Sequence, residues 1–383
     1  MFYIRSMVKK WTSMFSNVKR YKLVFIIALL PTTFMLSACS SAPETKSTDH
    51  RDPYESSNRK AFAFNMALDT HVVEPAAKIY QNTIKNVVTF NGTGLHSGKN
   101  TNVKLIPAAE NEGINFKRID FNKNNTIKAD YKNVSSATLC TTLENRFGRK
   151  VSTVEHLLAA LFICGIDNVT IEIDNEEIPI LDGSAKEFIN ILKNADIKKQ
   201  SARKKYLKVL NRIEYKDKDK KISIEPCSSF EVDFALHYNN KIIGNQRNKI
   251  NFTKDNLEDL IESRTFCLYE DIEKIKNIGL AQGGSLDNAI VVKDEKILNV
   301  NGLRNKKEFV NHKILDLAGD FILAGYNILG KVECYKGGHE FSNLFIREIL
   351  EKNKHNFEII EFKEKETKKI SQKGYFTGLA VNA

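Results

Sequence analysis

The fold of this chain is decided by the stretch Glu308-Phe309-Val310-Asn311-His312-Lys313-Ile314-Leu315-Asp316-Leu317-Ala318-Gly319-Asp320. Its apolar residues recur at helical spacing and continue to Leu323, which predicts a helix that is buried over much of its surface. His312, Asp316 and Asp320 follow at intervals of four and therefore lie along one helix face. Buried charge is costly, so these groups need partners or a metal ion. A histidine and a carboxylate at this spacing can bind one zinc ion; the alternative is a His–Asp pair at a domain edge.

Length and composition indicate an ordinary soluble globular protein. The 383 residues are 27% charged and 42% hydrophobic, enough for roughly two or three domains with ample core. The net charge of +11 and the pI near 9.1 favour an anionic partner, such as nucleic acid, anionic lipid or a phosphorylated substrate. The sequence has no zinc finger, RNA-binding signature or long basic amphipathic helix, so we do not expect nucleic acid. Its six cysteines form no C-x-x-C pair, which indicates reduced, separate thiols.

Residues 1–39 differ from the rest of the chain. A basic segment precedes an apolar run over residues 23–36, which Pro31 interrupts. This run is too short and broken for a transmembrane helix and is typical of a secretory signal. It ends in Leu36-Ser37-Ala38-Cys39, which looks like a bacterial lipobox in which Cys39 would be lipidated. The alternative is an apolar leader that is never processed.

A polar tether over residues 40–50 leads into a short segment with a resemblance of its own. The segment begins Asp52-Pro53-Tyr54-Glu55-Ser56-Ser57-Asn58-Arg59 and continues to Val73-Glu74-Pro75-Ala76-Ala77-Lys78-Ile79-Tyr80. It resembles the start of VacJ-type outer-membrane lipoproteins, which move phospholipids between the membranes of Gram-negative bacteria. The resemblance stops near Tyr80. Because a fragment of about thirty residues cannot bury its own core, we expect residues 40–80 to be a weakly ordered appendage.

The body of the protein begins at Gln81 with two predicted strands, residues 87–90 and 103–106. Between them lies Gly94-Leu95-His96-Ser97-Gly98, where His96 is either a loop hydrogen-bonder or a catalyst. A predicted strand at 137–143 precedes a buried helix that begins near Glu155-His156. Ser152 and Glu155 have the spacing of a capping box. The alternative is a metal ligand, His156, beside a carboxylate that deprotonates metal-bound water.

The basic run at residues 198–205 is the best linker candidate, and it divides the body into 81–203 and 204–383. In each part strands come first and helices later, which favours the α+β class over a doubly wound sheet. Asp182 and Ser184 are interpreted as turn and N-cap residues before a helix at 186–192. The sequence contains no G-x-G-x-x-G or Walker loop, which argues against a nucleotide-cofactor enzyme.

The second part contains further candidates on turns. Ser263-Arg264-Thr265-Phe266 follows a probable helix, and beyond it come a short amphipathic helix at 272–280, a turn at 282–285 and a strand at 289–292. By pattern alone this helix, turn and strand could be ordinary core. Lys336-Gly337-Gly338-His339 places a histidine on an accessible glycine turn, which suits proton transfer, and a final helix is predicted at 341–350.

Taken together, the body from about Gln81 to the last helix resembles UDP-3-O-acyl-N-acetylglucosamine deacetylases, zinc hydrolases that commit Gram-negative bacteria to lipid A synthesis. The order and spacing of the motifs match that family throughout. They are Gly94-Leu95-His96-Ser97-Gly98, Thr153-Val154-Glu155-His156-Leu157, Asp182-Gly183-Ser184-Ala185, Ser263-Arg264-Thr265-Phe266, Gly283-Gly284-Ser285, His312-Lys313-Ile314-Leu315-Asp316 and Gly338-His339.

The resemblance implies one zinc ion held by His156, His312 and Asp316, with the fourth position open for water. It implies that Glu155 is the general base and that His339 protonates the departing nitrogen. The remaining roles follow the same resemblance: Thr265 would stabilise the oxyanion, Asp320 would orient His339, and the substrate would contact Lys313, Phe266, His96, Leu268 and Ser285.

Family members have two similar domains, each a β-sheet layered against helices, with the active site between them. By the resemblance, an inserted unit at about 267–297 would form an apolar passage for the acyl chain. The substrate, a UDP-linked acylated amino sugar, carries a diphosphate that would account for the basic charge. We expect the body to be monomeric.

Residues 1–80 are a departure, because the family works in the cytoplasm, where UDP-sugars are found. A processed leader would carry the enzyme away from its substrate, so either the leader is unused or a gene fusion has stranded the enzyme. We expect cytoplasmic residence; the alternative is a chain anchored to a membrane through lipidated Cys39. The competing function is a non-catalytic, lipid-handling lipoprotein driven by the N-terminal segment. A purely structural zinc site would need a fourth protein ligand, and no cysteine is suitably spaced for it.

Overall fold

A computed structural model of the chain describes residues 79–363. The leader, Cys39, the tether, nearly all of the VacJ-like segment and the end of the basic tail lie outside these residues. The described part contains helices and several mixed or antiparallel sheets, which confirms the predicted α+β class. None of its helices is long and apolar enough to cross a membrane. Its cysteines are free thiols, as expected: Cys140, Cys164, Cys227, Cys267 and Cys334.

The first half of the body is built on a five-stranded sheet with two helices. The strands run in the order β2 (Val88–Thr93), β3 (Asn100–Pro107), β9 (Val169–Ile173), β4 (Ile114–Arg118) and β5 (Thr126–Lys128). The helices are α5 (Glu155–Ile163) and α6 (Lys186–Asn194). Residues alternate between buried and exposed along β3, so the sheet has one face toward the helices and one toward solvent.

A small sheet in the first half corrects one prediction. It contains β6 (Val134–Ser136), β7 (Thr142–Glu144) and β8 (Lys150–Val151). The strand predicted at 137–143 was therefore wrong over most of its length, since only its last residues belong to β7. The reason lies in Thr141, whose N–H donates to the Glu155 carboxylate at 3.0 Å instead of to a neighbouring strand.

The run at 198–205, predicted to be a linker, is also corrected. Most of it forms β10 (Ile197–Arg203), which pairs antiparallel with β1 (Tyr80–Ile84). Most side chains of β10 are exposed, so its lysines reach solvent while the backbone pairs, and Lys199 also lies over the Tyr80 ring. The polar composition correctly indicated that these side chains are exposed. It did not exclude a strand, because an exposed segment can still pair through its backbone.

The second half of the body is built on a seven-stranded sheet. The strands run in the order β12 (Ile213–Asp217), β13 (Lys220–Pro226), β19 (Asn327–Tyr335), β11 (Lys205–Val209) and β20 (Phe357–Glu361), and β14 (Phe230–His237) pairs with both β19 and β15 (Asn245–Asn251). The helices are α7 (Glu258–Ile261), α9 (Glu308–Phe321) and α10 (His339–Arg347). The predicted last helix was displaced, because α10 begins at His339 and not at Phe341.

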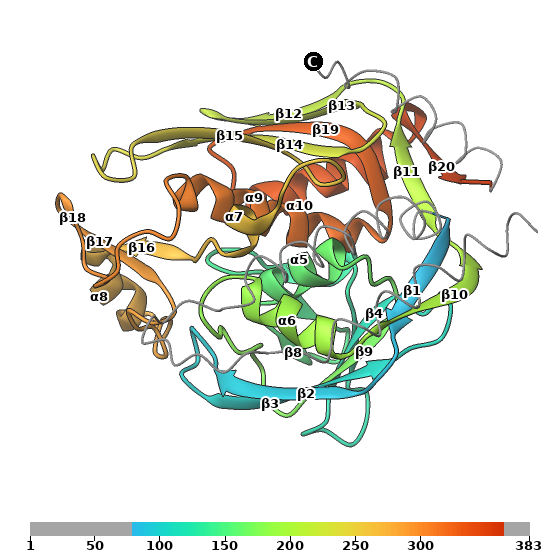
Figure 1. Ribbon diagram of the computed structural model, residues 1–383, viewed down its shortest axis with the longest axis horizontal. Coiled ribbons are helices and arrows are strands. Elements are labelled where there is room, and N and C mark those ends of the chain that lie inside the picture. The colour runs from blue at the N-terminus through green and yellow to red at the C-terminus, as the bar shows by residue number, and fades with distance from the viewer. Residues whose placement is uncertain (1–78, 364–383) are drawn as a thin grey trace, which may run out of the picture. The chain divides into compact units, whose positions relative to one another are not determined.

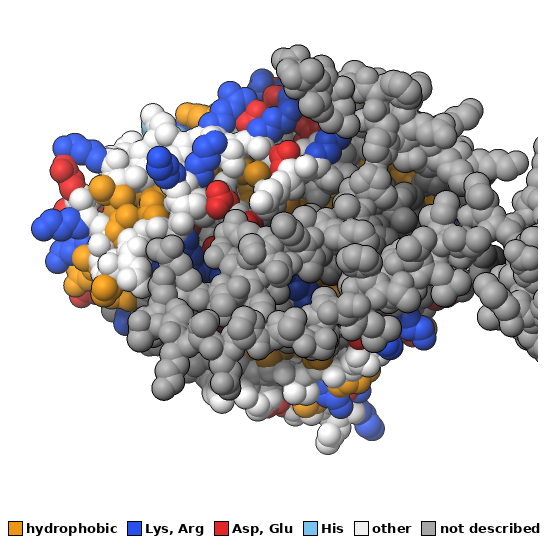
Figure 2. All heavy atoms as spheres, in the orientation of Figure 1, with side chains coloured by type: hydrophobic (Ala, Val, Ile, Leu, Met, Phe, Trp, Pro, Cys, Tyr) orange, Lys and Arg blue, Asp and Glu red, His pale blue; other side chains and the backbone are white. Residues whose placement is uncertain are grey.

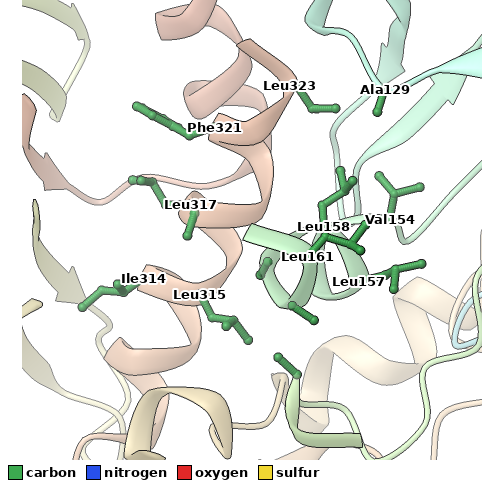
Figure 3. Close-up of a cluster of buried hydrophobic side chains, with 14 of the residues drawn as sticks. Ala129, Val154, Leu157, Leu158, Leu161, Ile314, Leu315, Leu317, Phe321 and Leu323 are labelled. Atoms are coloured by element: carbon green, nitrogen blue, oxygen red, sulfur yellow. The ribbon is translucent and has the colours of Figure 1, made fainter. Parts of the chain in front are cut away.

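The two sheets enclose a double layer of helices, as Figure 1 shows. Helix α9 lies against the seven-stranded sheet, and helix α5, from the first half of the body, packs against α9. Figure 3 shows buried side chains on both sides of α9: Leu315 points toward the leucines of α5, whereas Ile314, Leu317 and Phe321 point away from α5. Each fully buried Leu contributes about 1.5–3 kcal/mol. Every residue of α9 except Lys313 is buried, which confirms the predicted helix.

One glycine sets how closely these helices approach. A Cβ atom on Gly319 of α9 would lie 2.1 Å from the backbone oxygen of Glu155 on α5. Only glycine permits this separation, because real Cβ atoms essentially never come so near. The crossing therefore places the first turn of α5, with Glu155 and His156, directly against the polar face of α9.

A small unit projects from the second half at the edge of Figure 1. It contains β16 (Phe266–Leu268), α8 (Tyr269–Asn277), β17 (Ile290–Lys293) and β18 (Lys296–Ile297), with the strands in that order in one sheet. No residue of α8 is buried, so this helix is not ordinary core. Tyr269, Ile278 and Leu286 are exposed apolar residues, and Figure 2 shows hydrophobic side chains over this unit.

Candidate metal centre and active site

Two histidines and one aspartate converge where α5 meets α9. Nε2 of His156 lies 3.5 Å from Oδ1 of Asp316, and Nε2 of His312 lies 3.3 Å from the same oxygen. One donor atom from each of the three residues lies within 4.8 Å of the others, and all three side chains are buried. The helix spacing of His312 and Asp316 supplies two of the three residues, and the α5–α9 crossing brings His156 to complete the cluster.

The donor atoms fit a metal ion. Ligands held about 2.0–2.1 Å from a tetrahedral ion lie about 3.3–3.4 Å from one another, close to the two observed separations. Oδ1 of Asp316 and Nδ1 of His156 are buried and have no hydrogen-bond partner. A buried carboxylate oxygen that faces two imidazoles without a donor is costly unless a cation lies there.

The second nitrogen of His312 is fixed by the backbone. Nδ1 lies 3.1 Å from the carbonyl oxygen of Ser263, so it carries the proton and leaves Nε2 free to bind a metal. Burial lowers the pKa of His312 to about 3, which keeps its ring neutral. Burial alone would raise the pKa of Asp316, but the positive charges around it, including Lys313, hold it well below its usual range. A neutral imidazole and an ionised carboxylate are the forms in which histidine and aspartate bind a metal ion.

Lys313 lies beside this cluster. Its Nζ donates to Oδ2 of Asp316 at 2.9 Å and lies 5.5 Å from the centre of the Phe266 ring. The Phe266 ring packs edge-on against Phe309 and His312. The structure thus brings two predicted substrate-contacting residues, Lys313 and Phe266, to the rim of the donor cluster.

Glu155 and His339 face one another across the cluster. Nε2 of His339 lies 3.7 Å from Oε1 of Glu155, and burial raises the pKa of the Glu155 carboxyl. A raised pKa suits a carboxylate that accepts a proton. The predicted capping box is absent, because Ser152 Oγ donates to the Glu176 carbonyl and no side chain caps α5. That alternative for Glu155 was therefore wrong.

His339 is held by a chain of hydrogen bonds. Its Nδ1 lies 2.9 Å from Oδ2 of Asp320, and Oδ1 of Asp320 accepts a hydrogen bond from Thr141 Oγ1 at 2.6 Å. Burial alone would lower the pKa of His339, but the carboxylates of Asp320 and Glu155 raise it to about 10. His339 is the first residue of α10, not a loop residue as predicted, and in this state it can donate a proton from Nε2.

The remaining predicted site residues are His96, Thr265, Leu268 and Ser285. Burial lowers the pKa of His96, the Glu177 carboxylate opposes that shift, and the charge of His339 adds to it. Thr265 is fixed by backbone bonds to Gly183 and Ile290, both 2.8 Å. Leu268 ends β16. All hydrogen bonds that the structure gives Ser285 stay within its own exposed turn.

Asp182 and Ser184 occupy the turn before α6, as predicted, but the predicted N-cap role was wrong, because the N-cap residue of α6 is Ala185. The Asp182 carboxylate accepts hydrogen bonds from the backbone and hydroxyl of Ser184, and Ser184 Oγ accepts one from the N–H of Lys186. Asp182 also binds Arg304 at 2.8 Å, a contact across the two halves that the sequence did not indicate.

Sequence reasoning missed two buried groups that support the site. Thr141 bonds both Asp320 and Glu155. Glu308 at the start of α9 binds Arg264 at 2.8 Å, and both are buried, so this pair ties the segment before Thr265 to the metal-site helix. Arg264 belongs to the Ser263–Phe266 motif described above, so the sequence offered a signal for it. Nothing in the sequence distinguishes Thr141 from the neighbouring Thr142.

Three buried donors beside a carboxylate and a histidine are the arrangement typical of metal-dependent hydrolases. Comparison with known proteins makes the assignment specific. The family model of UDP-3-O-acyl N-acetylglycosamine deacetylases matches residues 81–351. The chain therefore belongs to the UDP-3-O-acyl-N-acetylglucosamine deacetylase family, which confirms the resemblance noted in its sequence.

Individual relatives agree with the family match. The UDP-3-O-acyl-N-acetylglucosamine deacetylase of Haemophilus influenzae (strain PittEE) is 43% identical over 291 residues, which are 75% of this chain and 95% of that protein. The protein of the same name from Actinobacillus succinogenes is 42% identical over 308 residues, 79% of this chain and 99% of that protein. That from Geotalea uraniireducens (strain Rf4) is 43% identical over 275 residues, 72% of this chain and 89% of that protein.

A second family matches the N-terminal part. The model of the MlaA lipoprotein family, to which the VacJ-type resemblance corresponds, matches residues 50–97. This match extends beyond Tyr80, where the sequence resemblance was expected to stop. Residues 81–97 are thus covered by both family models, and they form β1, β2 and the first part of the His96 turn.

Proposed function

We propose that this chain is a zinc-dependent deacetylase that hydrolyses the acetamide of UDP-3-O-acyl-N-acetylglucosamine, releases acetate and so catalyses the committed step of lipid A synthesis. The observation that carries the proposal is the buried cluster of His156, His312 and Asp316, in which Oδ1 of Asp316 faces both imidazoles and has no hydrogen-bond partner. Family membership supplies the substrate class, because the relatives are named for this deacetylation. One zinc ion fits the three-donor set.

A zinc ion held by His156, His312 and Asp316 would supply Lewis acidity, which would lower the pKa of a water molecule and polarise the amide carbonyl. Glu155 accepts the water proton, and its raised pKa favours that transfer. His339, protonated at neutral pH, donates from Nε2 to the leaving nitrogen, which is a poor leaving group as an amine anion. Asp320 holds the His339 ring through Nδ1, and Thr265 donates to the oxyanion.

A cavity of about 740 Å³ next to Lys313 offers room for the rest of the substrate. Lys220, Lys313 and Lys336 line it, and Lys336 pairs with Asp219 at 2.7 Å. The acidic residues Asp219 and Glu270 also line the cavity, so its three lysines leave one excess positive charge. We assign the diphosphate of the UDP group to this cavity. Leu268 lies on its wall, where the inserted unit with its exposed apolar residues begins. The acyl chain would follow that unit past Leu268 and Ser285, with His96 on the substrate side.

The test is the Glu155→Gln variant. Gln keeps the size of the side chain and its bond from Thr141, but it cannot accept the water proton. We expect about one zinc per chain in both proteins and deacetylase activity that falls by orders of magnitude. Glu176→Gln, at an exposed residue in the loop after β9, is the matched control and should keep full activity. Full activity in Glu155→Gln would refute the base assignment.

The domain boundary at 203 and 204 remains our proposal, supported by sheet membership. The strands of the five-stranded sheet and the β1–β10 pair all end by Arg203, whereas those of the seven-stranded sheet all begin at Lys205 or later. The Arg264–Glu308 and Arg304–Asp182 pairs would then fix the second domain internally and against the first.

The MlaA match keeps a second candidate in view, a lipid-handling lipoprotein with no catalysis. A chain without residues 1–80 separates the two functions, because its complementation of a deacetylase-deficient strain would reject the second. We propose cytoplasmic residence, where UDP-sugars are made. Cell fractionation with labelled palmitate tests this, since incorporation at Cys39 in a membrane fraction would establish the anchored alternative.

A further inference from the structure

Glu177 is a buried carboxylate to which neither the sequence nor the mechanism above assigned a role. It lies just after β9 and only 1% of it is exposed. Its Oε1 accepts hydrogen bonds from the N–H of His96 at 2.9 Å and from Thr153 Oγ1 at 2.7 Å. Its Oε2 accepts one from the N–H of Ser97 at 2.7 Å. One side chain thus joins two segments that are more than fifty residues apart in the chain.

The first segment is the turn around His96. A Cβ on Gly94 would lie 2.4 Å from Oε2 of Glu177, so glycine is needed for the turn to wrap around the carboxylate. The same turn holds the inserted unit, because His96 accepts hydrogen bonds from Ala281 at Nδ1 and from Gln282 at its carbonyl. Glu177 therefore anchors both the substrate-side histidine and the near edge of the acyl-chain unit.

The second segment leads into the metal site. Thr153 has a φ of +56°, an uncommon conformation for a β-branched residue, and it stands two residues before Glu155. Helix α5 has no side-chain cap at its start. The hydroxyl bond from Thr153 to Glu177 stabilises this conformation, and with it the direction in which the chain enters α5 at Glu155 and His156.

We propose that Glu177 is a positioning residue that sets the distance between the His96 turn, with its attached acyl-chain unit, and the Glu155–His156 pair. Three donors share one carboxylate, so a shift of either segment strains the other. Loss of the carboxylate would leave buried N–H groups without acceptors. The proposal rests on the proposed deacetylase function, because it assigns the two segments to substrate and to metal.

Two variants separate the two arms of this contact. Thr153→Val removes only the hydroxyl bond and leaves Glu177 bound to the His96 turn. We expect kcat to fall about tenfold to hundredfold with KM unchanged, because the base and one ligand are displaced, and zinc affinity in a chelator competition to fall about tenfold. Thr153→Ser keeps the hydroxyl and should restore both values. Gly94→Ala instead pushes on the turn and should raise KM more than it lowers kcat.

The neighbouring Glu176 provides the matched control for Glu177→Ala. Its side chain is 49% exposed and binds Lys99 at 2.7 Å, so Glu176→Ala should leave kcat, KM and zinc affinity unchanged, while Glu177→Ala changes all three. If Glu177→Ala does not fold, Thr153→Val and Gly94→Ala carry the test.

The proposal is overturned if Thr153→Val and Gly94→Ala lower only the melting temperature and leave kcat, KM and zinc affinity as in the parent chain. It is also overturned if both variants change KM and kcat in the same ratio. The zinc competition needs no substrate. A parent chain without deacetylase activity would therefore count against the proposed function, while the effect of Thr153→Val on zinc affinity would still decide the role of Glu177.

Discussion

Two clusters on the same face of α9 use the same residue type in opposite ways. Asp316 faces two imidazoles, and its Oδ1 has no hydrogen-bond donor. Asp320, one turn further on, has both oxygens bonded, one to His339 and one to Thr141. Both aspartates are buried. The difference teaches that position on the helix does not fix the role of a buried carboxylate; its partners do.

The physical reason is the cost of buried charge. A carboxylate oxygen without a donor is stable in the interior only if a cation compensates it, so the Asp316 cluster is open to a metal. A carboxylate with two donors is already satisfied and instead stabilises the charge of its partner. Asp320 is the largest of the charges that raise the pKa of His339, and Glu155 and Asp316 add to it. Asp316, in addition, faces the two histidines with which it forms the proposed ligand set.

The largest expected effect comes from removing a proposed ligand from the cluster of His156, His312 and Asp316, which we call the open cluster. His312→Ala removes one of three ligands, so the chain should lose its bound zinc and its activity should fall by on the order of 10⁴ or more. Metal analysis of the purified variant, alongside the deacetylase assay, checks both. His355→Ala, at an exposed histidine, is the control and should retain zinc and activity. Full zinc content in His312→Ala would contradict the ligand assignment.

A smaller effect is expected from a change in the cluster of Asp320, His339 and Thr141, which we call the satisfied cluster. Asp320→Asn keeps the shape of the side chain but removes its charge, so zinc should stay bound while activity falls about tenfold to hundredfold, less than loss of a whole general acid. Because the Asp320 charge raises the pKa of His339, its removal lowers that pKa. His339 then loses its proton at lower pH, and the alkaline limb of the pH profile of kcat/KM should move to lower pH.

The direction of that shift decides the role of Asp320. A limb that stays in place, with zinc retained, would show that Asp320 does not tune His339. Loss of zinc in Asp320→Asn would instead place Asp320 among the ligands. The spacing of His312, Asp316 and Asp320 at intervals of four is compatible with that alternative. Zinc content and the pH profile therefore need to be measured on the same preparation.

Local patterns made the open cluster predictable and left the satisfied one incomplete. The burial of α9 and the pairing of His312 with Asp316 follow from spacing within one helix. The partner of Asp320, Thr141, is 179 residues away, and no local pattern marks it. Glu176 and Glu177 are equivalent in the sequence, yet one is exposed and the other is almost wholly buried.

The errors in predicted structure have the same origin. Residues 198–205 were interpreted as a linker because they are basic and polar, but pairing with β1 is a tertiary contact that composition does not report. The strand predicted at 137–143 failed because Thr141 bonds side chains of α5 and α9. In both cases a partner distant in the sequence overrode the local pattern.

The smallest expected effect tests whether the satisfied cluster depends on the hydroxyl of Thr141 or on the charge of Asp320. Thr141→Val removes the donor to Oδ1 of Asp320 but keeps the backbone N–H that binds Glu155. Left with one partner, Asp320 loses part of its orientation, so activity should fall less than about tenfold while the free energy of unfolding falls by about 1–3 kcal/mol. Urea denaturation and kcat/KM measure the two effects, and Thr141→Ser should restore both. A loss of activity in Thr141→Val as large as that in Asp320→Asn would mean that orientation by the hydroxyl, and not the carboxylate charge, makes His339 a proton donor.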